Sequence, residues 1–388
     1  MMTTKELIQS YYDSLIRKDS KWQDLYSDGT VFSDASRFPM RKLFSIFSAL
    51  LILTLSVLAC SMPGAAGGGD NTAMPPTVML SFSTPTVGTN TSTANTTPVA
   101  AGTMAYHYAR LSDPPRTQVT DADGHWLATF TDNAYTVTLS GEERTFTEPN
   151  AKDPVISTVW VRVLPAPFNG TVDENWLSRA LNDHSPDVLA IAMQYITGAP
   201  PITDNNGLQF AGNASYGPVA ADDTREEGGD FNDYLGIAWT FGGITHQPRV
   251  IFFRSMDCSG FMRMVWGYRS GLPLTYVPNG GKSIPRHSWE ILSSGPGIVI
   301  IPDINDSQVT DFSHLAPGDL VFFHAKTEVH DPQIDHIGMY LGQDTAGNYR
   351  FISSRQKADG PTMGDFGGNS LLNGKGLYAQ AFRAARRF

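Results

Sequence analysis

Cysteine is nearly absent from this sequence: only Cys60 and Cys258 occur among 388 residues. Two cysteines cannot supply the disulfide framework on which many small secreted domains depend. A chain of this length, with 41% hydrophobic residues, instead has room for two modest domains with their own cores. One bridge between the two cysteines is formally possible, but their settings differ and we expect a separate fate for each.

Positive charge is also scarce. The chain has 28 Lys and Arg against 38 Asp and Glu, which gives a net charge of −10. This balance argues against nucleic acid as a partner, because phosphate backbones are bound by basic surfaces. Part of the acidity is local, and we interpret one acidic cluster as a solvated linker: Asp222, Asp223, Glu226, Glu227, Asp230 and Asp233.

Long hydrophobic runs are missing as well. The apolar stretch 43–58 is interrupted by serine and threonine and is short for a membrane span. Basic residues precede it and small residues end it, which is typical of a secretory signal. Its ending, Leu58-Ala59-Cys60, resembles a bacterial lipobox, and the resemblance implies that Cys60 is lipidated and becomes the mature N-terminus. An ordinary signal-anchor helix is the alternative, and in both cases the rest of the chain faces outwards.

Three segments precede the expected domains. Residues 1–39 lie upstream of the signal segment 40–60, so we expect an untranslated extension or a remnant, and part of it weakly resembles the start of a SnoaL-like domain. Residues 61–104 are rich in Gly, Pro, Ser, Thr and Asn, which predicts a flexible tether. If Cys60 carries lipid, Cys258 has no intramolecular partner, and this favours a reactive role for its thiol.

Residues 105–225 are expected to form an accessory region that is first β-rich and then helical. Alternating apolar residues predict strands at 134–139 and 159–164. Thr171 is expected to cap one helix, and 185–187 to open another that runs to 197. The role of this region stays open between recruiting a substrate and supporting the domain that follows.

Residues 226–388 show an α+β pattern. A helix is predicted from Cys258 to Ser270, closed by Gly271. The apolar run 250–253 before it is expected to be a packed strand. Short alternating segments after it predict an antiparallel sheet, with strands at 319–323, 336–341, 349–352 and 376–383.

The setting of Cys258 suits a nucleophile. The segment Asp257-Cys258-Ser259-Gly260 places the thiol where the helix begins, and the helix dipole there favours thiolate. His336 opens a predicted strand, and its imidazole can pair with the thiolate and transfer protons during acyl transfer. The backbone N–H of Cys258 is a natural donor to an oxyanion. A small buried cysteine without chemistry is the alternative reading of Cys258.

The other histidines compete weakly with His336. His324 and His330 precede it at six-residue steps, which match no compact zinc spacing. Asp335 is adjacent to His336, but neighbouring strand residues point to opposite faces of a sheet. We therefore expect no metal and no cofactor.

Motifs within residues 230–388 resemble the NlpC-type cell-wall peptidases, a papain-like family. The resemblance rests on Asp257-Cys258-Ser259-Gly260-Phe261, on Pro317-Gly318-Asp319-Leu320 and on His336-Ile337-Gly338-Met339. It implies an α+β fold in which a nucleophile helix packs on an antiparallel β-sheet, preceded here by the smaller accessory region. It also implies cleavage of peptidoglycan stem peptides, between D-glutamate and a diamino acid, by a thiolate–imidazolium pair.

Two positions depart from the pattern of that family. Ser353 stands where the family usually has a histidine or another stronger polar residue, so it would orient His336 only weakly. Trp239 stands where the family has a tyrosine on the oxyanion side of the cleft; its indole N–H can still donate one hydrogen bond. Both residues could equally be ordinary strand or core residues.

The sequence thus favours a lipid-anchored cell-surface cysteine peptidase that acts on peptidoglycan peptides and has no nucleic-acid partner. A papain-like amidase or acyltransferase on another substrate is the first alternative, because one fold hosts several chemistries. The second is a wall-binding lipoprotein with a weakened site.

Overall fold

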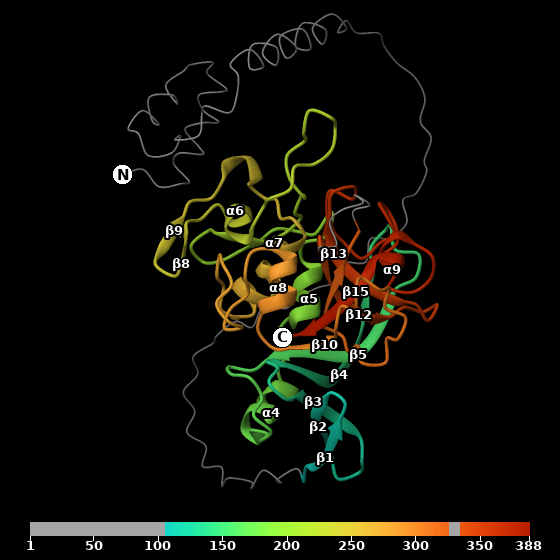
Figure 1. Cartoon of the computed structure of the whole chain (residues 1–388). Coiled ribbons are helices and arrows are strands. Elements are labelled where there is room, and N and C mark those ends of the chain that lie inside the picture. Colours follow the sequence, from blue (N-terminus) through green and yellow to red (C-terminus); the bar gives the residue numbers. More distant parts are fainter. Residues whose placement is uncertain (1–104, 326–333) are drawn as a thin grey trace, which may run out of the picture. The chain divides into compact units, whose positions relative to one another are not determined.

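The computed structural model describes residues 105–325 and 334–388, which belong to one compact unit (Figure 1). The predictions for segments 1–39, 40–60 and 61–104, with Cys60, therefore lie outside the described residues, as does His330. Within the described residues, no helix is both long and apolar enough to cross a membrane.

The accessory region begins with a five-stranded antiparallel meander in the order β1-β2-β3-β4-β5. Its buried face carries alternating side chains, among them Val137 and Leu139, on which a short helix packs through Leu177. The predicted strands 134–139 and 159–164 overlap β4 and β5. The five strands are β1 (His107–Ser112), β2 (Pro115–Thr120), β3 (Trp126–Thr131), β4 (Thr136–Phe146) and β5 (Val155–Val163).

Two helices follow, both shifted from the prediction. Helix α4 (Glu174–Leu181) is capped by Asp173 rather than Thr171, because the Asp173 carboxylate accepts the N–H groups of the first turn. Helix α5 (Val188–Met193) is capped by Asp187 as expected but ends before residue 197. Small hairpins complete the connection to the C-terminal part: β6 (Ile202–Thr203) with β7 (Gln209–Ala211), and, after helix α6 (Phe231–Leu235), β8 (Trp239–Phe241) with β9 (Ile244–His246).

The C-terminal part is built on a six-stranded sheet in the order β10-β15-β11-β12-β13-β14. The helix that carries Cys258 packs against β12 and β13 of this sheet, as the fold prediction required. The helices are α7 (Cys258–Met262), which continues as the π-helical turn η4 (Arg263–Arg269), α8 (Ser288–Ser294) and α9 (Leu377–Ala381). The strands are β10 (Ile298–Ile301), β11 (Leu320–Phe323), β12 (His336–Gln343), β13 (Tyr349–Arg355), β14 (Gly360–Thr362) and β15 (Phe382–Arg387).

Two predictions for this part are wrong. The run 250–253 is not a strand: Val250–Phe252 form the 3₁₀ turn η3, in which only Phe252 is buried while Val250 and Ile251 face solvent. Segment 376–383 is divided between helix α9 and the start of β15. In both segments only some of the apolar residues reach the core, so their apolar pattern does not identify a strand.

The accessory region and the C-terminal part share one hydrophobic core. Val155 and Val161 from β5 belong to the same buried cluster as Phe261 and Ile337. A polar contact crosses the same boundary, since the buried Arg387 pairs with Asp319 at 2.8 Å and donates to the Thr131 hydroxyl at 2.9 Å. The accessory region is thus a structural part of the domain that follows it.

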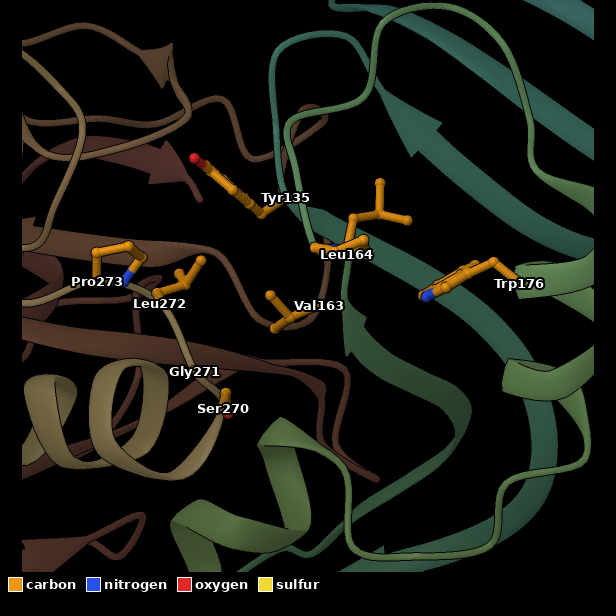
Figure 2. A pocket seen from close by; sticks show the side chains of 9 residues that line it. Tyr135, Val163, Leu164, Trp176, Ser270, Gly271, Leu272 and Pro273 are labelled. Atoms are coloured by element: carbon orange, nitrogen blue, oxygen red, sulfur yellow. The ribbon is translucent and has the colours of Figure 1, made fainter.

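A pocket of about 450 Å³ opens along this boundary (Figure 2). The accessory region contributes Tyr135, Trp176 and the end of β5, and the turn 270–273 after η4 closes the other side. None of the predicted site residues lines it, so the candidate active site lies elsewhere.

Replacing Arg387 with alanine should lower the free energy of unfolding by about 3–5 kcal/mol, because it leaves the Asp319 carboxylate buried without its partner. Urea unfolding followed by tryptophan fluorescence measures the change. Arg110→Ala is the matched control: its pair with Asp132 is exposed on the Arg side by 51%, and its loss should cost at most about 1 kcal/mol. Equal effects of the two substitutions would contradict the structural role of Arg387.

Candidate active site

Cys258 is the first residue of α7 and is 2% exposed. Asp257 caps the helix by accepting the N–H of Gly260 at 2.8 Å, which fixes the position of the thiol. Gly260 has no room for a side chain, because a Cβ there would overlap the carbonyl oxygen of Gly229. The Asp-Cys-Ser-Gly segment is therefore dictated by the cap on one side and by close backbone packing on the other.

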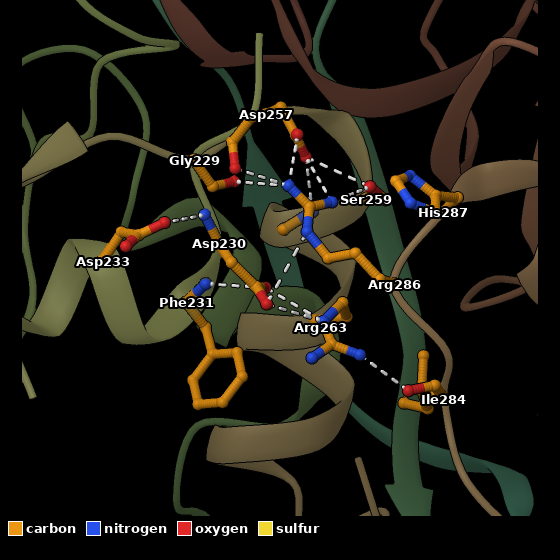
Figure 3. A network of polar contacts seen from close by, with 12 residues as sticks. Gly229, Asp230, Phe231, Asp233, Asp257, Ser259, Arg263, Ile284, Arg286 and His287 are labelled. Carbon is orange, nitrogen blue, oxygen red and sulfur yellow. Dashed lines mark hydrogen bonds and ion pairs between the residues drawn. The ribbon is translucent and has the colours of Figure 1, made fainter. Parts of the chain in front are cut away.

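A buried polar network holds the start of α7 in place (Figure 3). Arg286 Nη2 lies 2.6 Å from Asp257 Oδ2, and Arg286 Nη1 donates to the Ser259 hydroxyl at 2.6 Å. Arg286 also reaches Asp230 at 3.7 Å, and Arg263 Nε donates to Asp230 Oδ1 at 2.9 Å. The guanidinium of Arg286 thus connects the N-cap residue of α6 with the N-cap residue of α7.

This network corrects the interpretation of the acidic cluster. Asp222, Asp223, Glu226 and Glu227 are exposed as expected, but Asp230 and Asp233 are buried. The two buried carboxylates cap α6, and Asp233 pairs with Arg249 at 2.5 Å. The last part of the cluster is therefore structural rather than a solvated linker.

His336 is the first residue of β12, the strand against which α7 packs. The backbone of the following residue, Ile337, lowers the pKa of the Cys258 thiol. Gly338, two residues on, lets β12 approach β13 closely, since a Cβ there would lie 2.7 Å from the Phe351 ring. The His-Ile-Gly segment thus belongs to the strand on which the helix of Cys258 packs.

Strand β13 supports both halves of the pair. Ser353 is fully buried, and its hydroxyl lies 3.1 Å from Nε2 of His336. The adjacent Ser354 donates its hydroxyl to the carbonyl of Met256 at 2.6 Å, which ties the same strand to the loop before Cys258. One strand therefore touches the imidazole with one serine and the nucleophile loop with the next.

The electrostatics of Cys258 differ from the prediction. Burial raises the pKa of the thiol well above its usual value, and the nearby carboxylates of Asp257 and Glu227 add to this shift. The Ile337 N–H and the Arg286 guanidinium act in the opposite direction but are weaker. The resting thiol is consequently neutral, and the helix N-terminus alone does not hold it as thiolate.

Trp239 packs among aromatic side chains, which favours the core alternative for this residue. Its ring packs on Phe231 at 5.1 Å and on Tyr268 at 5.8 Å. It lies with the aromatic core residues around α6.

Tyr216 is the aromatic residue that the sequence reasoning missed. Ser215 forms a parallel bridge with Ser255, which brings Tyr216 beside the residues that precede Cys258. Burial raises the pKa of Tyr216, and so do the negative charges of a Cys258 thiolate and of Asp257. Its hydroxyl therefore keeps its proton, and no local motif in the sequence marks this residue.

The remaining candidates lie apart from this pair. His324 Nδ1 is 2.9 Å from Asp306 Oδ1, which also pairs with Arg383. Asp335 accepts the backbone N–H of Ala325 at 3.0 Å. In the described part of the chain, one group with metal-binding side chains occurs, Asp121, Asp123 and His125, on a surface turn between β2 and β3.

A cysteine at the start of a helix that packs on an antiparallel sheet, with a histidine at the start of one strand, is the arrangement of a papain-like domain. Residues 236–359 match the model of the NlpC/P60 family, so the C-terminal part of the chain carries an NlpC/P60 domain. The match includes Cys258, His336 and Ser353 but neither Tyr216 nor the residues after 359.

One solved structure with which the chain shares similarity is that of a protein from Staphylococcus aureus subsp. aureus Mu50, described as similar to lipoprotein, NLP/P60 family. The two sequences are 17% identical, the alignment covers 63% of this chain and 56% of that one, and the TM-score is 0.23. This chain therefore spans little more than half the length of that protein. No curated protein matches the chain.

Alkylation of Cys258 by iodoacetamide should show the raised pKa of the thiol directly. A raised pKa means that thiolate appears only at higher pH, so the labelling rate of the folded protein should rise with a midpoint above the value of about 8.5 for a free cysteine. The urea-unfolded protein is the control and should follow the free value. A midpoint below about 7 in the folded protein would contradict a neutral resting thiol.

Proposed function

We propose that this protein is a cysteine peptidase that hydrolyses peptidoglycan stem peptides, with Cys258 as nucleophile and His336 as general base and then acid. The observation that carries the proposal is the packing of α7, which begins with Cys258, against β12, which begins with His336. The family match at 236–359 supports the class of reaction.

The reaction begins with a neutral thiol. With Nε2–H of His336 donating to the Ser353 hydroxyl at 3.1 Å, Nδ1 is the nitrogen that takes the thiol proton as the sulfur attacks the substrate carbonyl carbon. The thiolate–imidazolium pair thus forms during attack rather than before it. The imidazolium then gives its proton to the leaving amine, and water, deprotonated by His336, hydrolyses the thioester and frees the stem-peptide carboxylate.

The negative charge on the substrate oxygen needs donors during attack. The backbone N–H of Cys258 is at the first position of α7, where helix N–H groups have no partner within the helix. The neutral hydroxyl of Tyr216 is the second donor that we assign, in place of the indole of Trp239. Its burial beside Asp257 keeps it protonated over the pH range in which the enzyme works.

The bond and the location follow from the resemblance. The D-glutamyl–diamino acid bond is the proposed cleavage point. The lipobox-like segment before Cys60 supports a lipid anchor on the outer face of a bacterial membrane, which membrane fractionation of a Cys60→Ser variant would test.

A second candidate is a wall-binding lipoprotein whose catalysis has weakened. The raised pKa of Cys258 and the neutral character of Ser353 favour it, because both slow formation of the attacking thiolate. A papain-like amidase or acyltransferase uses the same catalytic steps on another acyl group. The site residues therefore do not distinguish it from the peptidase, and the choice of substrate does.

Purified muropeptides incubated with the protein should release new free amines, and Cys258→Ala should abolish the release. The loss should exceed about 10³-fold, because removing a nucleophile leaves only binding and oxyanion stabilisation. Mass spectrometry of the products identifies the bond. Retained binding to sacculi without any release by the wild-type protein would favour the wall-binding alternative.

Ser353→Ala should lower kcat by no more than about tenfold, since a neutral hydrogen bond contributes a net 0.5–1.5 kcal/mol or so. Initial rates on the same muropeptide measure the effect. Ser354→Ala is the neighbouring control, which tests the link to Met256 instead of the imidazole. A loss above about 10³-fold for Ser353→Ala would mean that the hydroxyl is essential to the proton transfer.

A further inference from the structure

The imidazole of His336 has a neutral hydroxyl as its partner at Nε2. The Ser353 oxygen lies 3.1 Å from that nitrogen. A hydroxyl lacks the charge that makes a carboxylate or another ionised group a strong hydrogen-bond partner. The plane of the ring, which decides where Nδ1 points, therefore depends strongly on what packs against its faces.

Aromatic rings pack against this imidazole. The centroid of the Tyr378 ring is 5.2 Å from that of His336, at an interplanar angle of 34°, and the Phe323 ring is 5.7 Å away at 45°. The two aromatic rings also contact each other edge to face at 5.3 Å. The imidazole thus belongs to a packed group of rings in which it has little freedom to rotate.

The ring of Tyr378 is itself packed against the guanidinium of Arg355. The guanidinium carbon lies 5.2 Å from the centre of that ring. Burial raises the pKa of the phenol, and the positive charge of Arg355 opposes this shift. Arg355 is fixed in turn by the carbonyls of Gly364 and Gly368 and by the Ser370 hydroxyl. A Cβ at Gly368 would lie 2.9 Å from the Tyr378 ring, so the loop leaves space for the phenol and for nothing larger.

The place of Tyr378 in the chain is independent of the family motifs. It lies in α9 (Leu377–Ala381), beyond the matched segment 236–359. The phenol is 7% exposed and its ring contacts the imidazole of His336. One residue outside the motifs thus packs directly on the proposed general base.

We propose that Tyr378, anchored by Arg355, is a positioning residue for His336: its ring fixes the imidazole plane and stabilises the imidazolium that forms when the Cys258 proton is transferred. The proposal rests on the proposed function for its kinetic consequence. An aromatic face attracts a cation that packs on it, so the ring favours the protonated state of His336 over the neutral one. It supplies support that the neutral Ser353 cannot.

Removing the ring should therefore lower the pKa of His336. The charged groups that influence the pKa of Tyr378 or of Cys258 remain in place in such a variant: Asp335, Arg355, Asp257, Glu227 and Arg286. Because His336 accepts the proton in its neutral form, a lower pKa moves the acidic limb of the kcat/KM profile to lower pH.

The test compares Tyr378→Leu, Tyr378→Phe and Tyr340→Leu in the full chain. Tyr378→Leu should lower kcat on a muropeptide about 10–100-fold with KM changed less than about threefold. Tyr378→Phe keeps the ring and should restore most of the rate. Tyr340→Leu removes another buried phenol from the same hydrophobic cluster and should leave kcat and the pH profile unchanged even if it destabilises the fold.

A second readout does not depend on the substrate. The pKa of the His336 imidazole, followed by NMR and identified by comparison with His336→Gln, should fall by about 0.5–1 unit in Tyr378→Leu and in neither of the other variants. A folded Tyr378→Leu protein with unchanged kcat and imidazole pKa overturns the proposal, and so does an equal shift in Tyr340→Leu. If the wild-type protein releases no amine, the proposed function fails, while the NMR comparison still decides the role of Tyr378.

Discussion

The buried ion pair between Arg286 and Asp257 is the interaction on which the site depends. Asp257 caps the helix that begins with Cys258, and its carboxylate can hold that position only while a cation balances its charge away from water. Arg286 provides the cation and reaches Asp230, the cap of α6, and the Gly228 carbonyl as well. One guanidinium thus fixes two helix starts and the glycines that precede the first of them, and Cys258 has a single place because these contacts agree.

The candidate site residues come from elements that are distant in the sequence and packed together in the fold. Helix α7 supplies the thiol, β12 the imidazole and β13 the serine beside it, and a residue of α9 packs on the imidazole ring. The carboxylates that help to order the site also oppose a negative sulfur, since Asp257 and Glu227 raise the pKa of Cys258. The carboxylate that stabilises the helix start therefore disfavours the thiolate form of Cys258, and in the proposed mechanism proton transfer to His336 overcomes this effect.

Local patterns predicted much of this arrangement. The capping residue, the small residues after the cysteine and the alternation around His336 are short-range signals, and α7, β11, β12 and β13 follow them. Features that depend on contacts between residues distant in the sequence could not be predicted from local patterns. The apolar run at 250–253 became a 3₁₀ turn because the core accepts only Phe252. Tyr216 reaches the site through a bridge between Ser215 and Ser255. The raised pKa of Cys258 arises first from burial and then from the adjacent Asp257 and the more distant Glu227, and no local pattern reveals that burial.

The neutral, nearly inaccessible thiol has a consequence for the lifetime of the protein. Oxidation of a cysteine to sulfenic acid and beyond proceeds through the thiolate and requires access for the oxidant. Cys258 is 2% exposed and burial raises the pKa of its thiol, so neither requirement is met in the folded protein at neutral pH. A buried, protonated cysteine resists oxidation even where it has no disulfide partner and no reducing system restores it.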